Sequence, residues 1–186
     1  MCPTRILGIS GSLRSGSHSD GILASIADML PDNVAWSTLD IGELPHYNAD
    51  LEASALPAAV LQARAKVEAA AAVVLAVPEY NHGIPGVLKN TLDWLSRPVR
   101  ASCMMGKPVF FVTQSAGTLG GVRAQCQLRE TLASMLCELP PMKEMVVTHA
   151  GEKIRGGRIC DETTAQFIEA QLLAFLDRYV PLGEIA

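Results

Sequence analysis

The stretch PEYNHGIPGVLKNTLDWLSR, residues 78–97, decides the fold because it joins an apolar strand to a helix through a polar loop. Residues 69–77 are a short run rich in Val and Ala that ends at Pro78, as expected of a buried parallel strand. A helix follows from Pro85, and its apolar stripe is Leu88, Leu92 and Leu95. Open α/β sheets bind ligands where their strands end. The sequence therefore predicts a ligand site in this loop.

The rest of the chain alternates between strand and helix patterns, without repeats or a linker. We expect strands at residues 5–10, 34–39, 69–77, 107–113 and 144–148. We expect helices over residues 22–30, 56–67, 85–97, 122–137 and 163–179. This alternation requires right-handed crossovers and a parallel sheet that is covered on both faces. We therefore predict a single α/β domain over residues 1–186, with five parallel strands in the doubly wound order 2-1-3-4-5.

Composition excludes several classes of protein. The chain has 186 residues, of which 49% are hydrophobic, so it can fill one core. A net charge of −4 and a pI near 5.5, with no Lys/Arg run, argue against a nucleic-acid partner and an anionic membrane surface. No apolar stretch approaches the ~20 residues of a membrane span, and the first residues lack a signal-peptide layout. We expect a cytoplasmic protein.

The cysteines and histidines do not form a recognisable framework. The five cysteines are odd in number, widely spaced and without a CxxC pair: Cys2, Cys103, Cys126, Cys137 and Cys160. The four histidines are scattered and lack HxxxH spacing. We therefore expect neither a disulfide framework nor a metal site.

In the order 2-1-3-4-5 the loops after the first, third and fourth strands meet at one edge. The first of them, GSLRSGSHS at residues 11–19, combines small hydroxyl residues with Arg14 and precedes a helix. Backbone N–H groups, the positive helix end and a guanidinium together form an anion pocket that can hold a phosphate monoester. Its hydroxyls come from Ser10, Ser12, Ser15, Ser17 and Ser19. A plain serine-rich turn with a helix cap is the alternative.

Two nucleotide-binding motifs fail in this loop. A P-loop needs GxxxxGK[ST], and residues 11–17 have its glycine spacing but carry Ser17 in place of the lysine. The GxGxxG pattern of dinucleotide sites is absent. What remains is a site for one phosphate, as in a mononucleotide whose ring reaches the loops after the third and fourth strands.

Four separated blocks of sequence resemble one known family. They are SGSLRSGS at 10–17, PEYN at 78–81, PGVLKN at 85–90 with Asp93-Trp94, and GGVRAQ at 120–125. Together they resemble the NAD(P)H-dependent FMN reductases, which include quinone, chromate and azo reductases with a flavodoxin-like, three-layer αβα fold. The resemblance runs from residue 5 to about residue 140. One departure is Ser19, where the family often carries asparagine.

The resemblance implies the residues that bind the cofactor. Those expected at the FMN phosphate are Ser10, Ser12, Leu13, Arg14, Ser17 and Ser19. Those expected to frame the flavin ring are Pro78, Glu79, Tyr80, Asn81 and Gly83, with Gln114, Ser115, Ala116 and Gly117 on its other side. The segment 115–121, which opens a helix, is expected to supply N–H donors to the negative charge of reduced flavin. Because hydride transfer depends on positioning, we expect no dedicated catalytic side chain.

Several of these side chains keep two interpretations. Glu79 is expected to make structural hydrogen bonds rather than to transfer protons. Tyr80 is either a surface aromatic or a flank of the ring, and His82 either a plain loop residue or a contact to substrate or a partner chain. Lys89 and Asp93, at i and i+4, form either a surface pair or part of a subunit contact.

The resemblance implies an enzyme in which FMN takes a hydride from NADH or NADPH. The hydride passes to a small-molecule acceptor: a quinone, an azo compound, chromate or free flavin. A flavodoxin-type electron carrier is the alternative, which the absence of an acidic cluster near the loops disfavours, and a phosphate-ester enzyme is a third hypothesis. Short loops that leave the flavin edge open favour a homodimer or homotetramer.

Overall fold

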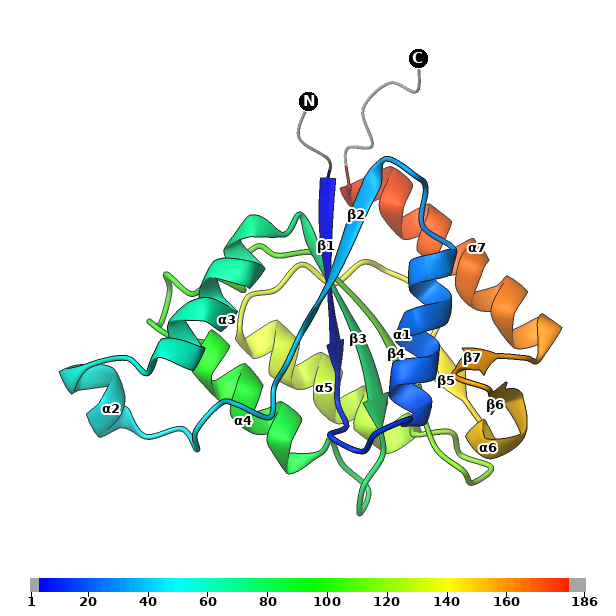
Figure 1. Ribbon diagram of the computed structural model, residues 1–186, viewed down its shortest axis with the longest axis horizontal. Coiled ribbons are helices and arrows are strands. Elements are labelled where there is room, and N and C mark those ends of the chain that lie inside the picture. The colour runs from blue at the N-terminus through cyan, green and yellow to red at the C-terminus, as the bar shows by residue number, and fades with distance from the viewer. Residues whose placement is uncertain (1–3, 181–186) are drawn as a thin grey trace.

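A parallel sheet with the order β2-β1-β3-β4-β5 forms the centre of this computed structural model, which describes residues 4–180 (Figure 1). Its strands are β1 (Thr4–Ser10), β2 (Val34–Leu39), β3 (Ala72–Pro78), β4 (Val109–Gln114) and β5 (Val146–Val147). The helices are α1 (His18–Asp28), α2 (Ala49–Ser54), α3 (Ala58–Ala69), α4 (Gly86–Leu95), α5 (Val122–Ser134), α6 (Ala150–Lys153) and α7 (Glu162–Tyr179). The predicted strand order is confirmed. Cys2, one of the five cysteines of the sequence, lies outside the described residues.

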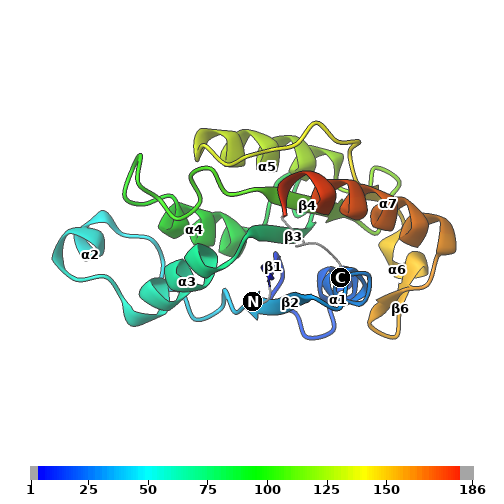
Figure 2. The ribbon, with the colours of Figure 1, turned by 90° about the horizontal axis from the view of Figure 1, so that it is seen from above.

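Helices cover both faces of the sheet, which gives the predicted three layers. In Figure 2, α3, α4 and α5 lie along one face, and α1 and α7 lie on the other. All of β3 is buried, and its side chains alternate between the two cores. Val73, Leu75 and Val77 pack with the first group of helices. Val74 and Ala76 pack with α1 and α7. The central strand therefore anchors both cores.

Several predicted boundaries were wrong, such as the start of the first helix at His18 rather than residue 22, and three of them have a clear cause. The third strand begins at Ala72 rather than residue 69, because helix α3 continues through Ala69. The fifth strand has two residues rather than five, since β4 pairs with it only from Thr113 onward and His149 then turns the chain at φ 50°. Helix α5 ends at Ser134 rather than at residue 137, because Leu136 adopts φ 58°.

Two connections contain structure that the sequence patterns did not predict. The segment after β2 includes α2, whose N-cap Asn48 accepts a hydrogen bond from the amide of Asp50. The glycine-rich segment before α7 forms α6 and a hairpin of β6 (Ile154–Arg155) and β7 (Arg158–Ile159). Gly156 and Gly157 turn this hairpin with φ 57° and 75°.

The sheet places the first residues of three loops side by side. In the register of the strands, Ser10 at the end of β1 lies opposite Ala76 of β3, and Pro78 at the end of β3 lies opposite Gln114 of β4. The strand arrows point to the lower edge of Figure 1, where these loops gather. The predicted site therefore has a structural basis at the carboxyl edge of the sheet.

Candidate functional site

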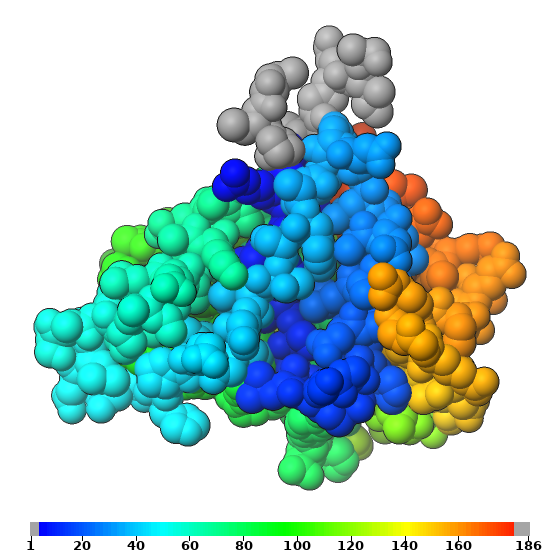
Figure 3. Space-filling view, in the orientation of Figure 1, coloured from blue at the N-terminus to red at the C-terminus, as the bar shows by residue number. Residues whose placement is uncertain are grey.

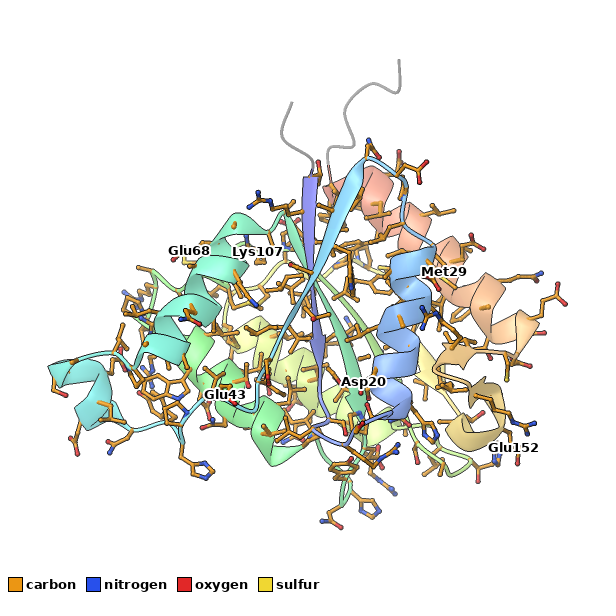
Figure 4. All side chains as sticks on the ribbon, viewed as in Figure 1. Asp20, Met29, Glu43, Glu68, Lys107 and Glu152 are labelled. Atoms are coloured by element: carbon orange, nitrogen blue, oxygen red, sulfur yellow. The ribbon has the colours of Figure 1, made fainter. Side chains whose placement is uncertain are left out.

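The loop between β1 and α1 is closed by a capping box. The side chain of Ser17 accepts a hydrogen bond from the amide of Asp20 at 3.1 Å, and the carboxylate of Asp20 accepts from the amide of Ser17 at 3.3 Å. Figure 4 labels Asp20 at the amino end of α1. This reciprocal pair fixes where the helix begins, as the alternative of a serine-rich cap predicted.

The same loop leaves several backbone amides without a partner. Among residues 4–180, no hydrogen bond is donated by the amides of Leu13, Ser15, Gly16, His18 and Ser19. The last two belong to the first turn of α1, where the helix dipole places partial positive charge. Unpaired amides at a helix start form a ready site for an anion. The cap therefore coexists with backbone donors that remain open.

Arg14 adds a permanent cation to this loop. Its amide donates to the hydroxyl of Ser12 at 3.3 Å, and its Nη1 donates to the carbonyl of Gly16 at 3.3 Å. The side chain is exposed, so its other guanidinium N–H groups remain accessible. Open amides and an accessible guanidinium therefore lie at the same loop.

The loop after β3 is a tight two-residue turn. Asn81 and His82 adopt φ 50° and 66°, and the backbones of Tyr80 and Gly83 exchange two hydrogen bonds of 3.0 Å. A Cβ at Gly83 would lie 2.6 Å from Oε1 of Gln127 on α5. Because two non-glycine residues are held at positive φ, the shape of this turn is strongly specified.

Gln127 and Glu79 tie this turn to α5. Oε1 of Gln127 accepts from the amide of Ile84 at 2.7 Å. The carboxylate of Glu79 accepts from the amides of Arg123 and Ala124 at 3.0 and 3.1 Å. Glu79 therefore caps a helix that has no side-chain cap of its own, as the predicted hydrogen-bonding role requires. Sequence analysis missed Gln127, which carries no motif.

The loop after β4 also brings backbone amides to this edge of the sheet. The amide of Ser115 donates to the carbonyl of Val147 at 3.1 Å, and the amide of Gly117 donates to the hydroxyl of Ser115 at 3.0 Å. Within the described residues, the amides of Ala116, Thr118, Leu119 and Gly121 donate no hydrogen bond. Because Glu79 occupies amides in the first turn of α5, the open donors of this segment lie in the preceding loop.

Direct contacts bring the three loops together. The hydroxyl of Ser12 lies 3.5 Å from that of Tyr80, which joins the first loop to the second. The amide of Glu79 donates to the carbonyl of Gln114 at 3.0 Å, which joins the second loop to the third. Nε2 of Gln114 donates to the hydroxyl of Ser19 at 3.4 Å, which joins the third to α1. The three loops therefore form one site.

The predicted site residues differ in exposure. Those with exposed surface are Leu13, Arg14, Tyr80, Asn81, Ala116 and Gly117, and those half-buried are Ser10, Glu79, Gly83 and Ser115. Buried are Ser12, Ser17, Ser19, Pro78 and Gln114. Ser19 has 0% exposure and lies beneath the loop, where its hydroxyl holds Gln114. Tyr80, at 50% exposure, presents its ring at the surface of the site.

Beside the site, Lys89 and Asp93 form an ion pair on α4, as the first of the two interpretations predicted; a subunit contact at this pair stays a prediction. Their side chains meet at 2.7 Å on the outer side of α4. The neighbouring Trp94 is fully buried, and its Nε1 donates to the carbonyl of Pro45 at 2.7 Å. Trp94 is therefore part of the hydrophobic core of this chain.

Metal sites and membrane spans were searched for in the part of the chain that the structure describes. Residues 4–180 contain no group of three His, Cys, Asp or Glu side chains that could hold a metal ion. The cysteines described, Cys103, Cys126, Cys137 and Cys160, are all free thiols. In the same range, no helix has both the length and the apolar content to cross a bilayer.

Comparison with known proteins identifies the family. Residues 4–152 match the family model described as NADPH-dependent FMN reductase. An NAD(P)H-dependent FMN reductase of Pseudomonas aeruginosa is 38% identical over 171 residues, covering 91% of this chain and 92% of that protein. A quinone reductase of Escherichia coli K12 is 32% identical over 176 residues, covering 92% and 93%.

A solved structure agrees with both. FerB, a flavoenzyme NAD(P)H:(acceptor) oxidoreductase from Paracoccus denitrificans, matches with a TM-score of 0.85 and 32% identity, covering 97% of this chain and 99% of that one. The unpaired amides and Arg14 at the β1–α1 loop fit the single phosphate of FMN. The chain therefore belongs to the NADPH-dependent FMN reductase family and has its flavodoxin-like fold.

Proposed function

We propose that this protein reduces quinones or free flavin, using NADH or NADPH as the reductant and FMN as the bound cofactor. One observation carries the proposal: a loop with unpaired amides and Arg14 lies at the same sheet edge as two loops that can frame a ring. When bound, FMN supplies the hydride-accepting and hydride-donating chemistry. The side chains hold, orient and shield it, and none is assigned to proton transfer.

The β1–α1 loop is assigned to the phosphate. The hydroxyls of Ser10, Ser12 and Ser17 and the guanidinium of Arg14 donate to it, together with the amides of the loop, including that of Leu13. Hydrogen bonds to a charged group contribute about 1.5–3 kcal/mol each, so a few of them hold a phosphate monoester. Ser19, which has no exposed surface, acts indirectly by holding Gln114.

The two other loops are assigned to the flavin ring. Pro78, Glu79, Tyr80, Asn81 and Gly83 form one side of its pocket. Gln114, Ser115, Ala116 and Gly117 form the other side. The amides of Ala116, Thr118 and Leu119 are the donors available for the negative charge that develops on the ring. The two hydrogen bonds between Tyr80 and Gly83 and the bond from the amide of Ile84 to Gln127 hold the first wall in place.

Further parts of the proposal concern the acceptor and the assembly. Azo compounds and chromate are proposed as additional acceptors, since a ring exposed at the sheet edge imposes little selection on acceptor shape. A homodimer or homotetramer supplies the surface that covers this edge, with His82 at the exposed tip of the turn as a candidate contact. We also propose that residues 1–186 form a single FMN-binding domain and that the protein works in the cytoplasm.

A steady-state assay tests this function. The purified protein, loaded with FMN, is mixed with NADH or NADPH and with a benzoquinone, an azo dye, chromate or FMN in excess. We expect oxidation of the nicotinamide to depend on both protein and acceptor, with no other protein added. A flavodoxin-type carrier would give no turnover in this mixture, and that result would refute the proposal.

A further inference from the structure

A cavity of about 490 Å³ lies between the amino-terminal half of α1 and the edge strand β2. Figure 3 looks onto this face, where α1 and β2 lie side by side. Its volume is typical of a small-molecule site. None of the residues that line it comes from the loops after β3 and β4, which are assigned to the flavin ring. The flavin ring therefore leaves this α1–β2 groove unfilled.

The indole of Trp36 forms an aromatic wall of the groove. A Cβ at Gly8 of β1 would lie 2.3 Å from Cζ2 of Trp36, so only glycine lets the indole lie flat against the sheet. The side chain of Trp36 is half-buried, and it lines the cavity together with Leu23 of α1. Such an apolar surface suits a planar aromatic ligand.

The polar groups of the groove favour hydroxyl donors. Oδ1 of Asp40 accepts from the amide of Gly42 at 2.9 Å, and Oδ2 of Asp20 accepts from the amide of Ser17. The second oxygen of each carboxylate accepts no hydrogen bond from residues 4–180. No lysine or arginine lines the cavity; the ammonium of Lys66 binds the carbonyl of Thr38 at 3.2 Å. The groove therefore accepts neutral hydroxyls better than a second phosphate.

The groove is continuous with the proposed phosphate site. Ser10, Ser12 and Leu13 line the cavity and also belong to the loop assigned to the FMN phosphate. A ligand here would place a phosphate at the loop, sugar hydroxyls at Asp40 and a flat base at Trp36. In dinucleotide-binding folds an acidic residue near the end of the second strand similarly binds a ribose.

We propose that the α1–β2 groove binds the adenosine part of a dinucleotide, whose phosphates leave the groove toward the β1–α1 loop. Two dinucleotides carry this group: FAD, taken in place of FMN, and the reductant NADH. The inference rests on the proposed function because the groove opens beside the loop that is assigned to the FMN phosphate. It also predicts discrimination: the carboxylates of Asp20 and Asp40 disfavour a 2′-phosphate, so adenosine binds more tightly than its 2′-phosphate.

Calorimetric titration tests the groove directly. Adenosine, AMP and adenosine 2′-phosphate are titrated, up to about 10 mM, into the FMN-free and the FMN-loaded protein. We expect adenosine to bind at least one of these forms, and Asp40→Asn to weaken it about tenfold or more, because a hydrogen bond to a carboxylate is lost. Asp32→Asn, at an exposed turn on the opposite edge, is the matched control and should change nothing.

Two further titrations identify the source of the adenosine group. If the source is FAD, the FMN-free protein binds FAD more tightly than FMN, and Asp40→Asn removes that difference without changing FMN affinity. If it is NADH, FAD has no advantage, and NAD⁺ displaces adenosine from the FMN-loaded protein. Absence of adenosine and AMP binding to both forms overturns the proposal, as does binding that Asp40→Asn leaves unchanged. FMN titration of the same preparations tests the proposed function separately.

Discussion

The two edges of the sheet collect opposite ends of the helices, and these ends find their hydrogen-bond partners in different ways. At the carboxyl edge, the loops after β1 and β4 leave backbone amides without partners. At the amino edge, Nζ of Lys107 donates to the carbonyl of Ala70, the amide of Gly106 to the carbonyl of Leu136, and the thiol of Cys103 to the carbonyl of Leu95. Figure 4 shows Lys107 and Glu68 close together, far from Asp20.

This contrast shows where the fold leaves donors open to a ligand. Buried or crowded backbone groups that are not paired cost free energy, so a chain normally pairs them itself. At the amino edge, Lys107, Cys103 and Gly106 pair carbonyls near the ends of α3, α4 and α5. At the carboxyl edge, the first two amides of α1 have no such partner within residues 4–180, although the neighbouring turns are tied together by Glu79 and Gln127. Open donors on a rigid edge suit an anion from outside.

The largest expected difference between the two edges concerns the buried thiols at the amino edge. Burial raises the pKa of Cys103 to about 11 and that of Cys137 to about 12. Relative to the ordinary value of 9.0, the thiolate fraction at neutral pH falls by about two and three orders of magnitude, respectively.

Alkylation by iodoacetamide at pH 8, followed by peptide mass mapping, measures this effect. We expect Cys126 and Cys160, which are exposed, to react in the folded protein. Cys103 and Cys137 should react only after unfolding in urea. Rapid labelling of either in the folded state would show that the amino edge is open.

Removal of the Arg14 cation at the carboxyl edge should have the next largest effect. Arg14→Ala deletes charge-assisted hydrogen bonds to the phosphate, so FMN affinity should fall about 10- to 150-fold. The urea midpoint should not change, because the side chain is exposed and, among residues 4–180, donates only to Gly16. Lys143→Ala, an exposed cation lost from the opposite edge, is the control and should leave FMN affinity intact. Equal affinities in wild type and Arg14→Ala would remove Arg14 from the site.

A substitution at Gly121 tests the rigidity of the carboxyl edge. This residue has φ 90°, and an added Cβ would lie 3.1 Å from both the amide nitrogen and the carbonyl oxygen of Gln114. Gly121→Ala should therefore lower the free energy of unfolding by about 1–3 kcal/mol. Gly86→Ala, where a Cβ meets open space, should be neutral or slightly stabilising. Urea unfolding of both variants measures the difference, and similar values would refute the constraint at Gly121.

The smallest expected effect concerns the tie between the loops. Glu79→Ala removes the cap of α5 and should lower the free energy of unfolding by about 0.5–2 kcal/mol. Glu79→Gln keeps one accepting oxygen and should cost less. Urea unfolding gives both values. If Glu79→Gln were the more destabilising variant, the negative charge rather than the hydrogen bonds would hold the two loops.

Most of the fold was predictable because its signals are local. The buried run that ends at Pro78 and the alternation of strand and helix patterns indicated the sheet order that the structure confirms. The short β5 was not predictable, since its length depends on where the chain meets β4. The β6–β7 hairpin was missed because its strands have two residues each, too few to show alternation.

The candidate site was predictable in the place of its loops and less so in the connections between them. Clustered Ser, Gly and Arg14 after the first strand indicated an anion loop, and the structure brings it against the loops at Tyr80 and Gln114. The cap that Glu79 provides to α5 joins residues 44 positions apart, which no local pattern reveals. The α1–β2 groove likewise depends on Trp36 lying over Gly8, a contact between neighbouring strands.

Comparison of FMN with riboflavin tests the central claim most directly, because the two ligands differ only by the phosphate assigned to the β1–α1 loop. The FMN-free protein is titrated with each ligand in a calorimeter, for wild type and Arg14→Ala. We predict that wild type binds one FMN per chain about 100-fold or more tightly than riboflavin, and that Arg14→Ala removes much of this difference. Equal affinity for FMN and riboflavin in the wild type would contradict the account.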